Sequence, residues 1–180
     1  MLRYLLFTIA VFVNVTIAIG QPTWFKNFSR IKVLETSRLE LESLMGKPEI
    51  TFEREHPSSV WVEYSTKDWK LTAFYSSGNC SANTSSLYDV PRGILTSIDI
   101  DLEKPVSFDH FRFDLSTFKR SEIEDIPGVI EYIDLRRGLK VWTNEFRSRK
   151  KQLRGLDLFP TDEQDLRLEC PQKESTNGGL

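Results

Sequence analysis

Histidine, the most frequent catalytic acid and base, is scarce in this chain of 180 residues. His56 and His110 are its two imidazole bases. His110 alternates with apolar neighbours, so a strand there would place its side chain beside Arg112 and Asp114. A serine hydrolase needs a serine on a sharp turn, and the sequence lacks the Gly-x-Ser-x-Gly motif that builds one. We therefore expect no catalytic residue, with a small secreted hydrolase that uses His56 or His110 as the alternative.

Carboxylates are plentiful, as in the pair Asp99 and Asp101 and in the acidic run at residues 162–165. General acid–base catalysis needs two carboxylates in a shared cleft that separates their pKa values, and closeness in sequence does not supply such a cleft. A calcium loop needs a glycine and regularly spaced acidic residues, which the 162–165 run lacks. We interpret this run as a solvated acidic turn and expect neither a bound metal nor a cofactor.

Two tryptophans are the first candidates for a binding surface. Alternate side chains of a strand point to opposite faces, so Trp61 would face away from Val62, and Trp142 away from Val141. Aromatic side chains on an otherwise polar sheet face often mark an interaction surface. The alternative is that a helix or the N-terminal segment around Trp24 covers both rings, because large aromatic side chains are usually buried.

Basic residues gather shortly after Trp142. The members of this basic cluster are Arg147, Arg149, Lys150, Lys151 and Arg154. Basic side chains near aromatic rings can bind single-stranded nucleic acid, but the chain has a net charge of −2 and a pI of about 5.8, and lysines at a sheet edge also discourage association between sheets. We expect no nucleic-acid partner. The cluster is either a solvated hairpin turn or a site for an acidic protein partner, and we group it with Trp61 and Trp142 as candidate binding residues.

The first twenty residues indicate where the protein goes. Arg3 supplies a positive charge, residues 4–19 are almost continuously apolar, and small residues precede Gln21. This is the pattern of a secretory signal peptide, and its apolar run is too short for a confident membrane span. We expect cleavage near Gly20, a secreted or periplasmic product and no stable membrane anchor.

Cys80 and Cys170 are the two cysteines of the chain. An even cysteine count in an oxidising compartment predicts a disulfide. The sequence lacks the paired ligand spacing of a structural zinc site and a local basic partner for a reactive thiol. The bridge would tie the loop at residues 76–86 to the end of the last ordered segment.

Hydrophobic spacing predicts two helices and several strands. The first helix spans residues 37–45, where Ser37 and Glu40 have the spacing of a capping box and Gly46 ends the helix. The second spans residues 116–124. Alternating apolar residues predict strands at 60–64, 69–75, 94–102, 108–114, 129–135, 139–143 and 152–159.

The two halves of the chain follow a similar plan, a helix and then three meandering strands. Aligning Glu63 with Glu131 brings Lys70 close to Lys140. We expect an α+β domain of mainly antiparallel sheet at residues 21–170, built from two repeats at 31–105 and 106–170. The absence of alternating helices and single strands argues against a doubly wound fold. The polar residues 171–180 are expected to be a disordered tail.

The sequence from Thr36-Ser37-Arg38 to Gly46-Lys47-Pro48 resembles the S-T-R…V…L-L-G-x-P helix of a family of uncharacterised secreted bacterial proteins. The resemblance continues through the segments 62–64, 78–80, 88–91, 114–120 and 165–170. More distantly, a helix ending in Leu-x-Gly-x-Pro before a meander is similar to the β-lactamase-inhibitor-like and SmpA/OmlA-like domains. That resemblance implies a non-catalytic module that binds protein. The lipid-anchoring cysteine of the SmpA/OmlA group is missing here.

Overall fold

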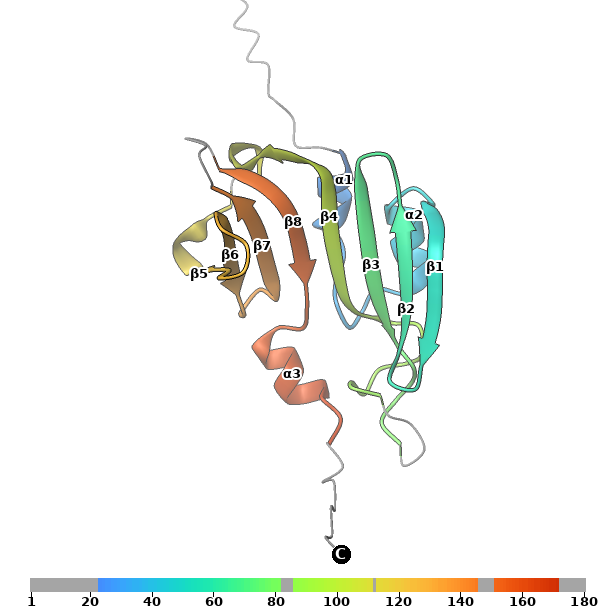
Figure 1. Cartoon of the computed structure of the whole chain (residues 1–180). Coiled ribbons are helices and arrows are strands. Elements are labelled where there is room, and N and C mark those ends of the chain that lie inside the picture. Colours follow the sequence, from blue (N-terminus) through green and yellow to red (C-terminus); the bar gives the residue numbers. More distant parts are fainter. Residues whose placement is uncertain (1–22, 82–85, 112, 146–150, 172–180) are drawn as a thin grey trace, which may run out of the picture.

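The computed structural model describes residues 23–81, 86–111, 113–145 and 151–171, and their main feature is an eight-stranded antiparallel sheet (Figure 1). Its strands are β1 (Glu49–His56), β2 (Ser59–Ser65), β3 (Trp69–Ser76), β4 (Leu95–Ser107), β5 (Lys119–Glu122), β6 (Val129–Asp134), β7 (Leu139–Asn144) and β8 (Gln152–Leu158). The order across the sheet is β1-β2-β3-β4-β8-β7-β6-β5. Each half of the chain therefore forms a four-stranded meander, and β4 and β8 join the two meanders.

Three short helices accompany the sheet. Helices α1 (Thr23–Phe28) and α2 (Arg38–Leu44) lie behind the β1–β4 half in Figure 1, and α3 (Asp162–Leu168) follows β8. Two 3-10 turns, η1 (Phe108–His110) and η2 (Leu115–Thr117), separate β4 from β5. The predicted capping box is confirmed, since Ser37 caps α2 and both of its reciprocal hydrogen bonds with Glu40 are present. Gly46, with φ +79°, follows the end of α2.

The core lies between the sheet and the two N-terminal helices. Alternate strand residues point into it, so Val62, Leu71, Ile100 and Val141 are each no more than 1% exposed. Leu41 of α2 is equally buried. Burial of one such side chain contributes about 1.5–3 kcal/mol. The alternation of apolar and polar residues along each strand thus decides which face of the sheet the helices cover.

The predicted fold class is wrong. Of the residues that the structure describes, 46% are in strands and 18% in helices, and both halves join a single sheet, so the protein is β-rich and not an α+β domain of helix-plus-three-strand repeats. In place of the helix at residues 116–124 stand η2 and the edge strand β5. Phe118 and Ile123 would lie about 140° apart on a helix and would not form one apolar stripe. The backbone of Lys119–Glu122 instead pairs with β6.

Further segments also differ from the predictions. The expected strand at 108–114 contains η1, and its phenylalanines pack on α1, with the rings of Phe25 and Phe111 4.7 Å apart in an edge-on contact. Strand β1 and helix α1 were not predicted, and neither was helix α3 at the acidic run, where Thr161 and Gln164 form a second capping box. The expected strands at 60–64, 69–75, 94–102, 129–135, 139–143 and 152–159 are confirmed as β2, β3, β4, β6, β7 and β8.

The predicted disulfide is present. Cys80 and Cys170 are bonded with their Cα atoms 5.6 Å apart, which fastens the loop after β3 to the residue after α3 and its cap. The Tyr88 hydroxyl strengthens the same junction by donating to Asp165 of α3 at 2.9 Å. The predicted signal peptide at residues 1–20 and all but Pro171 of the predicted tail lie outside the described residues. Within the described ranges, no helix has the length and apolar character needed to cross a membrane.

Candidate functional site

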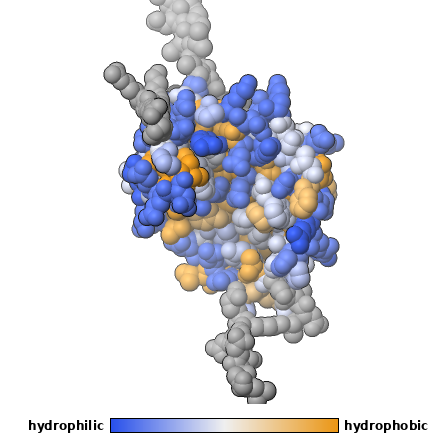
Figure 2. Space-filling model, viewed as in Figure 1, coloured by the Kyte–Doolittle hydropathy of each residue, from blue (hydrophilic) through white to orange (hydrophobic). Residues whose placement is uncertain are grey.

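The two faces of the sheet differ. Helices α1 and α2 cover one face, and we call the opposite side, which faces the viewer in Figure 1, the open face. Residues paired across antiparallel strands share a face, so the register assigns to the open face a row of residues running from β2 to β7. The members of this row are Glu63, Thr72, Asp99, Asp157 and Lys140. Figure 2 shows this side as largely hydrophilic, with smaller hydrophobic areas.

Aromatic rings form a cluster at the β1–β3 end of the open face. The Trp61 ring stacks on Phe74 with centroids 5.8 Å apart and meets Phe52 edge-on at 5.6 Å. Phe52 is 42% exposed. The buried Trp61 Nε1 has no hydrogen-bond acceptor among the described residues. The neighbours that half-bury Trp61 therefore belong to its own face of the sheet, so the Phe52–Trp61–Phe74 cluster forms an aromatic surface there.

Trp142 lies in the other half of the same face. Its Nε1 donates to Asp157 Oδ2 at 2.9 Å. Its neighbour directly across the strand pair is Gly155, which has no side chain to separate the ring from Asp157. The Lys140 ammonium lies 5.2 Å from the Trp142 ring centroid, 3.4 Å from Asp157 and 3.5 Å from Glu131. This part of the face therefore holds a cation between two carboxylates and an indole ring.

Two carboxylates oppose one another in the middle of the row. Asp99 of β4 pairs directly with Asp157 of β8, and like charges in this position are destabilising. Burial, followed by the charge of Asp157, raises the pKa of Asp99 to about 6, although Lys140 acts in the opposite direction. Burial also raises the pKa of Asp157, against the effects of its hydrogen bond from Trp142 and of Lys140. Both groups are thus partly desolvated at the centre of an exposed sheet face.

The structure places some of the predicted binding residues together and separates others. Trp61 and Trp142 share the open face, as their sequence parity predicts, but β3, β4 and β8 lie between their strands. Four strand spacings amount to roughly 19 Å. The acidic residues between them were not predicted as part of this surface, because their meeting depends on the β4–β8 register.

Two members of the basic cluster, Lys151 and Arg154, are among the described residues. Lys151 bonds the Tyr132 hydroxyl and pairs with Glu145 at 3.2 Å, and Tyr132 belongs to the buried side of β6. Arg154 is exposed on β8. Arg147, Arg149 and Lys150 lie outside the described residues. The two described members therefore give no support to a joint site with Trp142.

The histidines do not form a common site. The two histidines lie at opposite ends of the strands. His56, at the end of β1, is level through Ser59 and Ser76 with the start of β4, whereas His110 follows the end of β4. His56 Nδ1 lies 2.8 Å from Ser58 Oγ, a contact within one exposed hairpin turn. None of the ion pairs found among the described residues involves either histidine. This geometry gives the hydrolase alternative no support.

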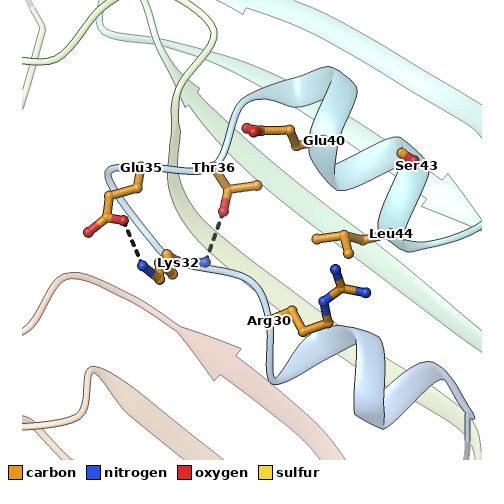
Figure 3. Close-up of a pocket in the computed structure, with 7 residues that line it drawn as sticks. All are labelled: Arg30, Lys32, Glu35, Thr36, Glu40, Ser43 and Leu44. Atoms are coloured by element: carbon orange, nitrogen blue, oxygen red, sulfur yellow. Dashed lines mark hydrogen bonds and ion pairs between the residues drawn. The ribbon is translucent and has the colours of Figure 1, made fainter.

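The helix-covered side has a hollow of about 480 Å³ that is lined by α2 and by the segment that joins α1 to α2 (Figure 3). Its lining residues are Arg30, Lys32, Glu35, Thr36, Glu40, Ser43 and Leu44. Lys32 pairs with Glu35 at 3.1 Å, and Glu40 accepts hydrogen bonds from the Ser37 cap. Because these polar groups mostly stabilise the local fold, the open face is the stronger candidate site.

In the described part of the chain, no group of three or more histidine, cysteine or acidic side chains has an arrangement that could hold a metal ion. Comparison of the chain with family models, with curated proteins and with solved structures finds no match. The open face is therefore interpreted from its own geometry.

Proposed function

We propose that this protein is an exported, non-catalytic module whose open face binds a protein or a component of the cell envelope. The observation that carries the proposal is a sheet face with aromatic rings at both ends of a charged row, while helices α1 and α2 pack on the other face. Soluble proteins seldom leave such surfaces without a role, and tryptophans are enriched among the residues that dominate binding energy. The Cys80–Cys170 disulfide supports export, since such bonds persist in oxidising compartments.

Affinity capture with tryptophan variants tests this proposal. Tagged wild-type protein, Trp61→Ala and Trp142→Ala are incubated with native envelope extract and with culture fluid. Loss of a central tryptophan typically costs 2 kcal/mol or more of binding, about thirtyfold in affinity, so each variant should retain much less of the partner.

Leu166→Ala serves as the matched control. Leu166 is 90% exposed on α3, outside the sheet, so its truncation removes an exposed apolar side chain without touching the open face. The control should capture the partner as the wild type does. Equal capture by the wild type and both tryptophan variants would contradict the proposal.

A further inference from the structure

We propose that the open face between Trp61 and Trp142 binds an extended, basic polypeptide segment, whose lysine or arginine side chains pair with Glu63, Asp99 and Asp101. This inference rests on the proposed function and names the chemistry of its partner. Four observations support it: an internal cation in one half of the face, unpaired carboxylates in the other half, the dimensions of the surface, and a charge arrangement that destabilises the fold.

The internal cation is Lys140. Its ammonium lies within 3.5 Å of carboxylate oxygens of both Asp157 and Glu131 and near the Trp142 ring. A lysine head group is thus already accommodated by this combination of carboxylates and indole. Cation–π attraction adds to the ion pairs in such an arrangement.

The other half of the face has two cations of its own, Arg54 opposite Trp61 and Lys70 opposite Asp101, but the ion pairs found among the described residues leave three of its carboxylates without a partner. Glu63, Asp99 and Asp101 take part in none of the ion pairs found among the described residues. Lys70, which is in register with Asp101, pairs instead with Glu103 at 3.5 Å. Positive side chains of a bound segment would meet these carboxylates.

The dimensions suit a short extended segment. Across the strand pairs, Trp61 is in register with Phe74 and then with Ser97 of β4. From the other side, Trp142 is in register with Gly155 and then with Asp101 of β4. The two tryptophans are therefore four strands apart across the sheet and four residues apart along β4. These offsets correspond to a diagonal of roughly 23 Å, which about seven extended residues span. A segment of this length would contact both aromatic sites and cross the acidic row.

The charge arrangement acts against folding. Asp99 and Asp157 are directly opposed, both are partly buried, and the pKa of each is raised. An asparagine at position 99 would have nearly the same shape without the repulsion. Features that reduce stability without a structural reason are typical of functional sites, where stability and binding compete. A bound cation would offset the repulsion.

Fluorescence anisotropy with a labelled ten-residue peptide of alternating lysine and threonine tests the proposal, at pH 7.5 and low salt. The wild type should bind this peptide, and Asp99→Asn should bind it about fivefold more weakly, the value of roughly one exposed ion pair. Asp162→Asn, which removes an exposed charge on α3, should leave the affinity unchanged. Asp99→Asn should also melt at a higher temperature than the wild type, so weaker binding cannot result from loss of folding.

Three results would overturn the inference: equal peptide affinity for the wild type and Asp99→Asn, equal binding of a glutamate–threonine peptide, or competition by spermine as strong as that by unlabelled peptide. The capture experiment distinguishes failure of this inference from failure of the proposed binding function. A partner lost on Trp142→Ala but fully retained by Asp99→Asn would leave the binding function standing and refute the basic segment. A partner retained by every variant would refute both.

Discussion

At the scale of single residues, Asp99 gives the sharpest prediction about stability. Its pKa is about 6 in the folded protein against an ordinary value of 3.8, because of burial and the charge of Asp157. Between these two pH values the folded state binds a proton that the unfolded state has released, so stability falls as the pH rises through this window. The whole penalty is present above about pH 6 and absent below pH 3.8.

Asp99→Asn should therefore raise the free energy of unfolding by about 1–2 kcal/mol at pH 7.5, a value reduced to allow for partial solvent exposure. At pH 4 the gain should nearly vanish. Urea unfolding at both pH values measures the difference, with Asp162→Asn as the control. A gain of the same size at both pH values would show that Asp99 acts through packing and not through its charge.

Trp142 allows a test of the hydrogen bond alone. The indole N–H donated to Asp157 lowers the pKa of that carboxyl and partly offsets the effect of burial. Trp142→Phe keeps an aromatic ring and removes the donor, so the pKa of Asp157 should rise further. An NMR titration of the Asp157 side-chain carbon in both proteins measures the change, and an unaltered or lowered pKa would contradict this role.

The alternation of side chains along a strand is enough to predict that Trp61 and Trp142 lie on the same face, since each is next to a valine that points into the core. The meeting of Asp99 with Asp157 could not be predicted in the same way. It depends on which strands of the two meanders become neighbours and on a register interrupted by an irregularity after Asp101. Local periodicity contains no information about either.

At the scale of elements, α2 connects the covering layer to the sheet. Arg38 pairs with Glu53 of β1 at 2.8 Å and with Glu42 at 2.9 Å, and the Tyr64 hydroxyl donates to Glu42 at 3.0 Å. These contacts join the helix to the two strands at the β1 edge. In a helix of seven residues, the N–H groups of the first turn, which lack partners inside the helix, are a large share of its backbone donors, so its cap is important.

Ser37→Ala should lower the free energy of unfolding by about 1 kcal/mol, because the side-chain acceptor for the Glu40 N–H is lost. Ser43→Ala is the matched control: Ser43 is an exposed serine within the same helix, and alanine there should be neutral or slightly stabilising. Chemical denaturation compares the two variants. Equal stability of both would contradict the importance of the cap.

The elements that were predicted correctly have one buried face, whereas the missed elements β1, β5 and α3 have no buried residue. Helix α1 is the exception, since its Phe25 and Phe28 are buried but it has only six residues. Strand β1 is exposed at all eight positions, so burial imposes no alternation on its sequence. Helix α3 has no buried residue, yet Thr161 and Gln164 supply a capping signal that could have revealed it. The wrong helix at residues 116–124 shows the opposite failure, in which polar residues of a short edge strand resemble a helix start.

At the scale of the whole molecule, the two meanders form one sheet because β4 and β8 pair along their length. The similarity between the halves predicts two separate helix-plus-strand units. Each separate unit would leave the edge strand β4 or β8 with unpaired backbone groups, and such an edge is a template for pairing with another strand. Joining the halves removes two of these edges. It also extends the open face across both halves, so that Trp61 and Trp142 belong to a single surface.

The disulfide should be a large contributor to the stability of this arrangement. It closes a loop of 90 residues, for which the chain-entropy model gives about 4–5 kcal/mol. The double variant Cys80→Ala/Cys170→Ala should melt well below the wild type in a thermal scan without reductant. Adding reductant should lower the melting temperature of the wild type and leave that of the variant unchanged. A variant as stable as the oxidised wild type would contradict this contribution.

The position of α1 bears on how the protein matures. Phe25 packs against Phe111, and its ring centroid lies 5.7 Å from that of Phe113, so a residue soon after the predicted cleavage site belongs to the hydrophobic core. Cleavage near Gly20 keeps these contacts, whereas cleavage beyond Phe25 would remove them.

Mass spectrometry of exported protein should therefore find an N-terminus at or close to Gln21. The variant Gly20→Leu should form this N-terminus more slowly, because signal peptidases require small residues before the cleaved bond. Protein that retains Met1 in membrane fractions would contradict processing, and a mature N-terminus beyond Phe25 would contradict the role of α1 in the exported fold.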